Sequence, residues 1–138
     1  MTSAGYTISR CPKASHKETV VREKDIENII LEYLMYQNIF AWKNNTVGIY
    51  DKGKGVYRKN MNKYAINGVA DILGLLPDGR MLAIEVKTPK GRVSPSQQKF
   101  LDRVNKSGGV AFVARDLIDV VNKLKELKND NQTKGVSE

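Results

Sequence analysis

The sequence has little of what structural zinc centres and disulfide scaffolds require. Of its 138 residues, Cys11 is the one cysteine and His16 the one histidine. A single cysteine excludes an internal disulfide framework, and these two residues together exclude a cysteine-rich or multi-histidine zinc site. No run of about 18 apolar residues is present, so no segment is predicted to cross a membrane. Residues 1–25 lack the apolar core of a signal peptide, which favours an intracellular, cytoplasmic protein.

Charge of one sign dominates instead. The chain carries 23 Lys and Arg against 15 Asp and Glu, for a formal net charge of +8 and a pI near 9.6. An excess of this size favours a polyanionic partner, nucleic acid above all. The length fits one domain, with a core large enough to need no covalent staple.

Hydrophobic periodicity divides the chain into a single domain over residues 19–128, between a flexible N-terminal arm (1–18) and a flexible C-terminal tail (129–138). Helices are predicted over residues 20–37, 95–106 and 116–128. Strands are predicted over residues 39–50, 69–76, 80–87 and 110–114, with the first broken or bulged at Asn44-Asn45. The order α-β-β-β-α-β-α predicts an α/β fold in which helices flank a small mixed sheet.

The bend Pro77-Asp78-Gly79 sets the register of the central hairpin. This tripeptide suits a three-residue loop with Pro first and Gly in the left-handed region. Such a loop pairs Leu76 with Arg80, and the same register places Asp71 directly opposite Glu85. Their Cβ atoms are then expected about 4.5–5.5 Å apart.

Two facing carboxylates repel each other, and burial makes their charge costlier still. A divalent cation, Mg²⁺ or Mn²⁺, removes the conflict, because Mg²⁺ binds one or two carboxylates and leaves further positions to water and phosphate. Lys87 lies two residues after Glu85 and projects from the same face. These groups suit hydrolysis of a phosphodiester. The alternative is an ion-pair cluster with a structural role only.

Basic residues surround this hairpin in the sequence, and we expect them to contact DNA phosphates. Residues 51–67 are predicted to be a mobile loop. The predicted DNA-binding residues are Lys43, Asn44, Lys52, Lys54, Arg58, Lys59, Lys63, Lys90 and Arg92. Asn44 fits a bulge or turn equally well, and Tyr57 and Tyr64 fit either base stacking or core packing. Trp42 is expected in the core.

Several segments, taken in order, resemble the VRR-NUC (virus-type replication-repair nuclease) family of the PD-(D/E)XK nuclease superfamily. The matching pieces are Glu23-Lys24-Asp25-Ile26, Trp42-Lys43-Asn44-Asn45, Gly68-Val69-Ala70-Asp71, Glu85-Val86-Lys87, Gly91-Arg92-Val93-Ser94-Pro95-Ser96-Gln97 with Phe100 and Leu101, and Gly108-Gly109. Each piece alone is weak, but their order and spacing over residues 20–120 are specific. Ala70 departs from the family pattern, which often has Pro or Ser there.

The resemblance implies a restriction-endonuclease-like α-β-β-β-α-β core and a role for each matching residue. Asp71 and Glu85 would bind Mg²⁺ (or Mn²⁺), with the Val86 carbonyl as a third ligand. Lys87 would be the catalytic lysine, and Gln97 would reach the site from the second predicted helix. An acid of the first helix would approach the metal, with Glu23 preferred and Glu27 as the alternative.

Small members of this family resemble homodimeric Holliday-junction resolvases. The resemblance therefore implies a metal-dependent, structure-selective endonuclease acting on branched DNA as a homodimer, with two sites related by twofold symmetry. It also allows a virus-encoded origin and action in a host cytoplasm. Two alternatives stay open at this point: a nuclease for ordinary duplex or nicks, of restriction or repair type, and a catalytically idle DNA-binding module.

Overall fold

The structure is a computed structural model that describes residues 20–45, 49–58 and 62–134. The predicted N-terminal arm and Lys59 lie outside these ranges. Nine elements follow in chain order: α1 (Glu23–Tyr36), β1 (Phe40–Lys43), β2 (Ile49–Asp51), β3 (Val56–Arg58), β4 (Ile72–Leu75), β5 (Met81–Val86), α2 (Pro95–Lys106), β6 (Val110–Ala114) and α3 (Leu117–Lys134). No helix within the described ranges combines the length and the apolar composition that a membrane crossing requires.

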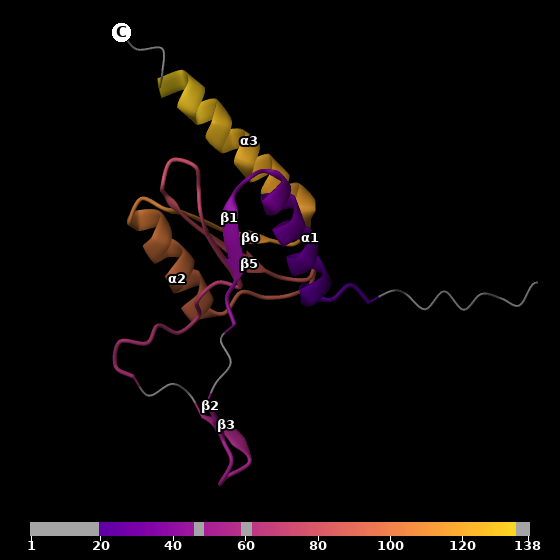
Figure 1. Cartoon of the computed structure of the whole chain (residues 1–138), viewed down its shortest axis with the longest axis vertical. Coiled ribbons are helices and arrows are strands. Elements are labelled where there is room, and N and C mark those ends of the chain that lie inside the picture. Colours follow the sequence, from indigo (N-terminus) through magenta and orange to yellow (C-terminus); the bar gives the residue numbers. More distant parts are fainter. Residues whose placement is uncertain (1–19, 46–48, 59–61, 135–138) are drawn as a thin grey trace, which may run out of the picture.

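The main sheet has four strands in the order β1-β4-β5-β6. Strand β4 pairs antiparallel with both β1 and β5, whereas β5 and β6 run parallel. The parallel pair needs a crossover, and α2 supplies it. This is the predicted mixed α/β architecture, with helices on both faces of the sheet (Figure 1).

Side-chain alternation along the strands gives the sheet two apolar faces. One face packs against α1 and α3 in a core cluster that includes Ile30, Ile72, Ile84 and Val120. The other packs against α2 in a smaller cluster formed by Ala70, Ala83, Leu101, Val104 and Ala111. The second face is the one to which Glu85 belongs, because residues two apart on a strand share a face.

The turn after β4 confirms the predicted register. The Leu76 N–H donates to the Arg80 carbonyl at 2.8 Å, and Gly79 has the left-handed φ of 88° that closes the loop. Ile72 pairs with Ile84, the position next to Asp71 and Glu85.

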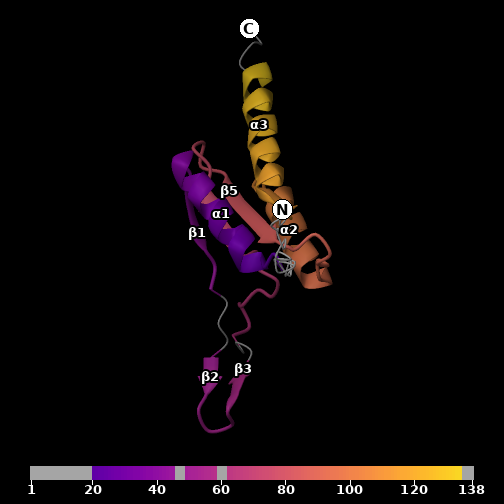
Figure 2. The same ribbon diagram turned by 90° about the vertical axis from the view of Figure 1, so that its right-hand side faces the viewer.

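Residues 39–50 are interrupted at Asn44-Asn45, as predicted, but the prediction that both parts belong to one strand is wrong. Strand β1 ends at Lys43, and β2 belongs to a separate two-stranded sheet with β3. Asp51 folds this hairpin back: its carbonyl accepts the Gly55 N–H at 2.9 Å and its carboxylate accepts the Gly53 N–H at 2.9 Å. The hairpin formed by residues 49–58 stands clear of the main sheet in both views (Figures 1 and 2).

Two smaller predictions also need correction. Helix α3 continues to Lys134, six residues past the predicted end, because its polar last turns meet no Gly or Pro and Thr133 donates to the Asn129 carbonyl at 2.8 Å. Trp42 is not a core residue: it lies on the edge strand β1, 42% exposed, with its ring centroid 5.2 Å from that of Phe40.

Candidate functional site

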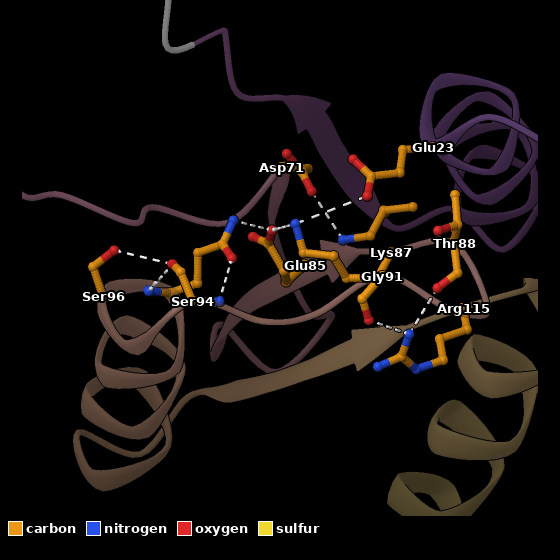
Figure 3. A network of polar contacts seen from close by, with 11 residues as sticks. Glu23, Asp71, Glu85, Lys87, Thr88, Gly91, Ser94, Ser96 and Arg115 are labelled. Atoms are coloured by element: carbon orange, nitrogen blue, oxygen red, sulfur yellow. Dashed lines mark hydrogen bonds and ion pairs between the residues drawn. The ribbon is translucent and has the colours of Figure 1, made fainter.

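Acidic, basic and amide side chains meet where β5 ends. Glu85 is the penultimate residue of β5 and only 1% exposed, and Lys87 follows directly after the strand. Figure 3 shows Asp71, Glu85, Lys87 and Glu23 converging there from three elements or their ends. Glu85 is thus buried because it belongs to β5, whose other residues from Leu82 to Val86 are buried and apolar.

One oxygen of Glu85 is held twice and the other is not held at all. Oε1 lies 3.0 Å from Lys87 Nζ and accepts a hydrogen bond from Gln97 Nε2 at 2.5 Å. Oε2 is buried and has no hydrogen-bond partner among the described residues. A buried carboxylate oxygen without a partner is costly, and in a native site it calls for a ligand.

The surroundings shift the proton affinities of this pair. Burial, reinforced by the charges of Asp71 and Glu23 against the opposing effect of Lys87, raises the pKa of Glu85 to about 7. Burial alone would lower the pKa of Lys87, but its hydrogen bond and charge interaction with Glu85 outweigh this and raise it above the ordinary value. Lys87 is therefore an ammonium at neutral pH, and Glu85 exchanges its proton there.

Asp71 lies immediately before β4, and its side chain takes the place of a backbone carbonyl as hydrogen-bond acceptor for β5. Its Oδ2 accepts the Val86 N–H at 2.9 Å, a donor that the ladder would direct to the Ala70 carbonyl. That carbonyl accepts from Asn44 Nδ2 at 3.3 Å instead, and the Asn44 N–H donates to the Asp71 carbonyl at 2.7 Å. The N–H and C=O of one antiparallel residue point the same way, so the Val86 carbonyl also faces the side of Asp71.

The start of α2 fixes the orientation of Gln97. Ser94 caps the helix: its Oγ accepts the Gln97 N–H at 3.3 Å, and its own N–H donates to Gln97 Oε1 at 2.9 Å. With the amide oxygen held in this capping box, Nε2 is the end directed at Glu85. The predicted approach of Gln97 from the second helix matches this arrangement.

The structure separates the two acids of the first helix. Glu23 Oε1 lies 3.9 Å from Lys87 Nζ, at the edge of the cluster. Glu27 is buried one turn later and forms an ion pair with Lys43 at 2.5 Å. Lys43, predicted to bind DNA, is thus directed at Glu27, and Glu23 is the acid beside the site.

The donor set suits a hard divalent cation. Among the described residues no three His, Cys, Asp or Glu side chains are arranged to hold a metal by themselves. The oxygens available are the two carboxylates, Asp71 and Glu85, and the Val86 carbonyl. Mg²⁺ commonly takes one or two carboxylates and completes its shell with water and phosphate, so this set fits the ion, and the partnerless Oε2 of Glu85 is the observation that favours it.

Arg115 was not predicted from the sequence. It lies just after β6, and its Nη1 donates to the carbonyls of Thr88 and Gly91, each at 2.7 Å (Figure 3). These contacts hold the turn that follows Lys87 and carries the exposed residues Lys90 and Arg92. No local pattern signals them, because the partners are 24 and 27 residues away.

The other predicted DNA-binding residues do not join the carboxylate cluster. Lys52, Lys54 and Arg58 are exposed on the projecting hairpin, where Arg58 Nε pairs with Asp51 at 2.7 Å. Lys63 follows the hairpin, and its Nζ lies 4.9 Å from the centroid of the Tyr64 ring.

The fold and the site together define a class: a mixed α/β domain with an acid pair and a lysine at the end of its central hairpin. Residues 17–116 match the family model of the VRR-NUC domain. The chain belongs to the VRR-NUC domain family.

Comparison with solved structures supports the fold. A structure described as a "VRR_NUC domain protein" superposes with a TM-score of 0.55 at 16% sequence identity, covering 76% of this chain and 86% of that chain. No curated protein matches. Family membership makes the protein a nuclease-type hydrolase with DNA as its class of substrate.

Proposed function

We propose that this protein is a Mg²⁺- or Mn²⁺-dependent endodeoxyribonuclease that hydrolyses phosphodiester bonds in branched DNA, in the manner of a Holliday-junction resolvase, and that it works as a homodimer. The observation that carries the metal dependence is the buried Oε2 of Glu85, which has no hydrogen-bond partner among the described residues. A four-way junction requires two symmetric cuts, which a twofold dimer supplies.

Asp71, Glu85 and the carbonyl of Val86 would hold the divalent ion. When bound, the ion supplies positive charge that offsets the two carboxylates and polarises the phosphate. The protein's own contribution is to hold the acids rigidly. Asp71 is fixed by the Val86 N–H and Glu85 by Gln97 and Lys87.

Lys87 acts as a cation and hydrogen-bond donor. Glu85 raises the pKa of Lys87 above its ordinary value, so the Lys87 ammonium is charged at neutral pH. In this state it donates hydrogen bonds and does not act as a base. Held 3.0 Å from Glu85, it can orient a water molecule or a phosphate oxygen beside the acids. Glu23, 3.9 Å away, limits the directions in which this ammonium can turn.

Backbone contacts complete the proposal. Lys90 and Arg92 follow Lys87 by three and five residues and lie on the turn that Arg115 holds. Lys52 and Lys54 extend the basic surface onto the hairpin. Each phosphate contact made by such a residue should steepen the salt dependence of log affinity by about 0.9 on duplex DNA.

A cleavage panel tests the proposal. Linear duplex, nicked duplex, flap, fork and four-way junction of equal total length are incubated with the protein in Mg²⁺, in Mn²⁺ and in EDTA. The proposal expects paired, symmetric incisions in the junction with either metal and none in EDTA. Preferential cutting of linear duplex would overturn the branched-DNA part, and absence of any cutting would overturn the endonuclease. Sedimentation in the same buffer tests the dimer.

A further inference from the structure

The hairpin of residues 49–58 contributes nothing to either core cluster. Among the described residues its strands pair only with each other, and the described side chains of β3 are all exposed. An isolated two-stranded hairpin is marginal in water, so each contact that keeps this one folded is informative. It is held by the Asp51 turn, the Arg58–Asp51 ion pair and a contact between two tyrosines.

Tyr50 and Tyr57 form one face of this hairpin. They are directly cross-strand partners, with ring centroids 5.2 Å apart and ring planes at 58°. They are nevertheless 52% and 67% exposed. The opposite face carries the Asp51–Arg58 ion pair together with exposed Val56, so the aromatic rings of the hairpin are gathered on one face.

The hairpin is also rooted at the active site by both of its connections. Its chain leaves the main sheet at Asn44, whose N–H bonds to the Asp71 carbonyl, and returns through Gly68 and Ala70 to Asp71 itself. Figures 1 and 2 show the hairpin projecting from this end of the sheet. A DNA strand that is held at Asp71 and continues past this end of the sheet would run toward the hairpin.

Charge at the tip matches a nucleic-acid partner. Asp51 is engaged by Arg58 and by the turn, which leaves Lys52 and Lys54 as the net charge of the tip. A basic tip with two accessible aromatic rings is the combination that binds DNA by phosphate contact and base stacking together. Stacking requires a base face, which a continuous duplex hides and an unpaired segment offers.

We infer that Tyr50 and Tyr57 form a stacking platform for unpaired DNA bases next to the scissile strand, and that this platform gives the enzyme its preference for branched over continuous DNA. The inference rests on the proposed action on DNA and assigns the selectivity to one face of the hairpin. Lys52 and Lys54 contribute affinity without selectivity, because phosphates are the same in paired and unpaired DNA.

The test compares two DNA probes of equal length and equal phosphate number, one fully paired and one with a short central mismatched bubble. Affinities are measured for the full chain in Ca²⁺, an ion that takes oxygen ligands. A 2-aminopurine in the bubble reports stacking through its fluorescence.

The variants are Y50T/Y57T, which keeps β-propensity, Y50F/Y57F, which keeps the rings, and Y36T as the matched control. Tyr36 is 80% exposed and ends α1, about 20 Å along the helix from Glu23.

The wild-type protein, Y50F/Y57F and Y36T should prefer the bubble and quench the 2-aminopurine. Y50T/Y57T should reduce the preference by about fivefold or more, with an unchanged unfolding temperature of the core. Its affinity for the paired probe should stay unchanged, which shows that the hairpin still presents Lys52 and Lys54. A wild-type protein without preference, or a Y50T/Y57T variant that retains it, would overturn the inference while leaving cleavage by the acid–lysine site intact. Failure of the wild type to bind either probe would overturn the proposed DNA activity as well.

Discussion

Gln97 and Glu85 are joined by a 2.5 Å hydrogen bond that links the first turn of α2 to the end of β5. The amide of Gln97 uses both of its ends, because its Oε1 accepts the Ser94 N–H at 2.9 Å while its Nε2 meets Glu85. The helix cap and the carboxylate that we propose as a metal ligand therefore share one side chain. Any change that rotates this amide should affect both helix stability and the position of Glu85.

Replacing Gln97 with Met keeps the side-chain length and removes both hydrogen bonds. We expect cleavage to fall about tenfold or more because Glu85 loses the donor that orients it. The weakened cap should lower the free energy of unfolding by about 0.5–2 kcal/mol. S94A is the control: it removes the Oγ cap at a similar cost but keeps the Ser94 N–H on Gln97. Cleavage rates and urea unfolding are measured for both, and an equal loss of activity in S94A would assign the effect to helix stability.

Replacing Lys87 with Met removes the ammonium beside Glu85. We expect cleavage of any DNA substrate to fall about 10²–10³-fold, the size seen when a positioned donor is removed from an active site. Binding to the same DNA should change little. K90M, three residues later on the surface, is the matched control and should weaken binding while leaving the rate at saturating DNA near the wild-type value. A K87M variant that cuts at nearly the wild-type rate would contradict the assignment.

Divalent metal should stabilise the folded protein through the acid pair. At a Mn²⁺ concentration 100 times the dissociation constant, the expected gain is about 2.7 kcal/mol, seen as a rise in unfolding temperature. E85A and D71N should abolish this gain, whereas D78N, at the exposed turn of the same β-hairpin, should retain it. Absence of any shift at millimolar Mn²⁺ in the wild type would favour a purely structural ion-pair cluster.

The register of the acid pair was predictable because it depends on local chemistry alone. Pro77 and Gly79 select the loop type, the loop fixes the pairing of Leu76 with Arg80, and strict alternation carries this pairing to Asp71 and Glu85. The same holds for the capping box of Ser94 and Gln97, whose spacing is a local signature of a helix start.

Contacts between distant segments were not predictable in this way. Glu23 and Glu27 are one turn apart on the same helix, so their spacing cannot show which of them lies at the site. Their partners distinguish them, because Glu23 lies near Lys87 after β5 and Glu27 pairs with Lys43 of β1. Strand β3 was mistaken for part of a loop, and most of β2 for the end of the preceding strand, because each has only three residues and their turn is rich in Gly and Lys. Their pairing depends on cross-strand contacts that periodicity does not reveal.

Glu85 should make the metal-free protein less stable as the pH rises. Its pKa is 4.5 ordinarily and about 7 in the fold, so between these values the folded state keeps a proton that the unfolded state has released. The free energy of unfolding therefore falls across this window, by up to about 3 kcal/mol, and the loss is complete above pH 7. E85Q should remove this part of the slope. Urea unfolding in EDTA at pH 5 and pH 8 measures the change in the free energy of unfolding between the two pH values. An equal change in the wild type and in E85Q would show that Glu85 is not the group responsible.

Gly68 fixes the distance between the Asp71 segment and α2. Its φ of 74° is left-handed, and a Cβ added there would lie 2.4 Å from the Ser96 carbonyl carbon and 2.6 Å from the Gln97 nitrogen. Since these are backbone atoms, G68A should displace the first turn of α2 and draw Gln97 away from Glu85, in addition to straining the backbone by about 1–2 kcal/mol.

G79A separates the two effects. Gly79 has a similar φ of 88°, but an added Cβ there meets nothing within 4 Å, so this variant carries the backbone strain without the clash. We expect both variants to lose stability, with the larger loss in G68A, and only G68A to lose most of its cleavage activity under conditions where both are folded. Unfolding curves and cleavage rates of the two proteins decide this. If G79A lost activity as severely as G68A, strain remote from the site would account for the defect, and the close packing of Gly68 on α2 would have no special role in positioning Gln97.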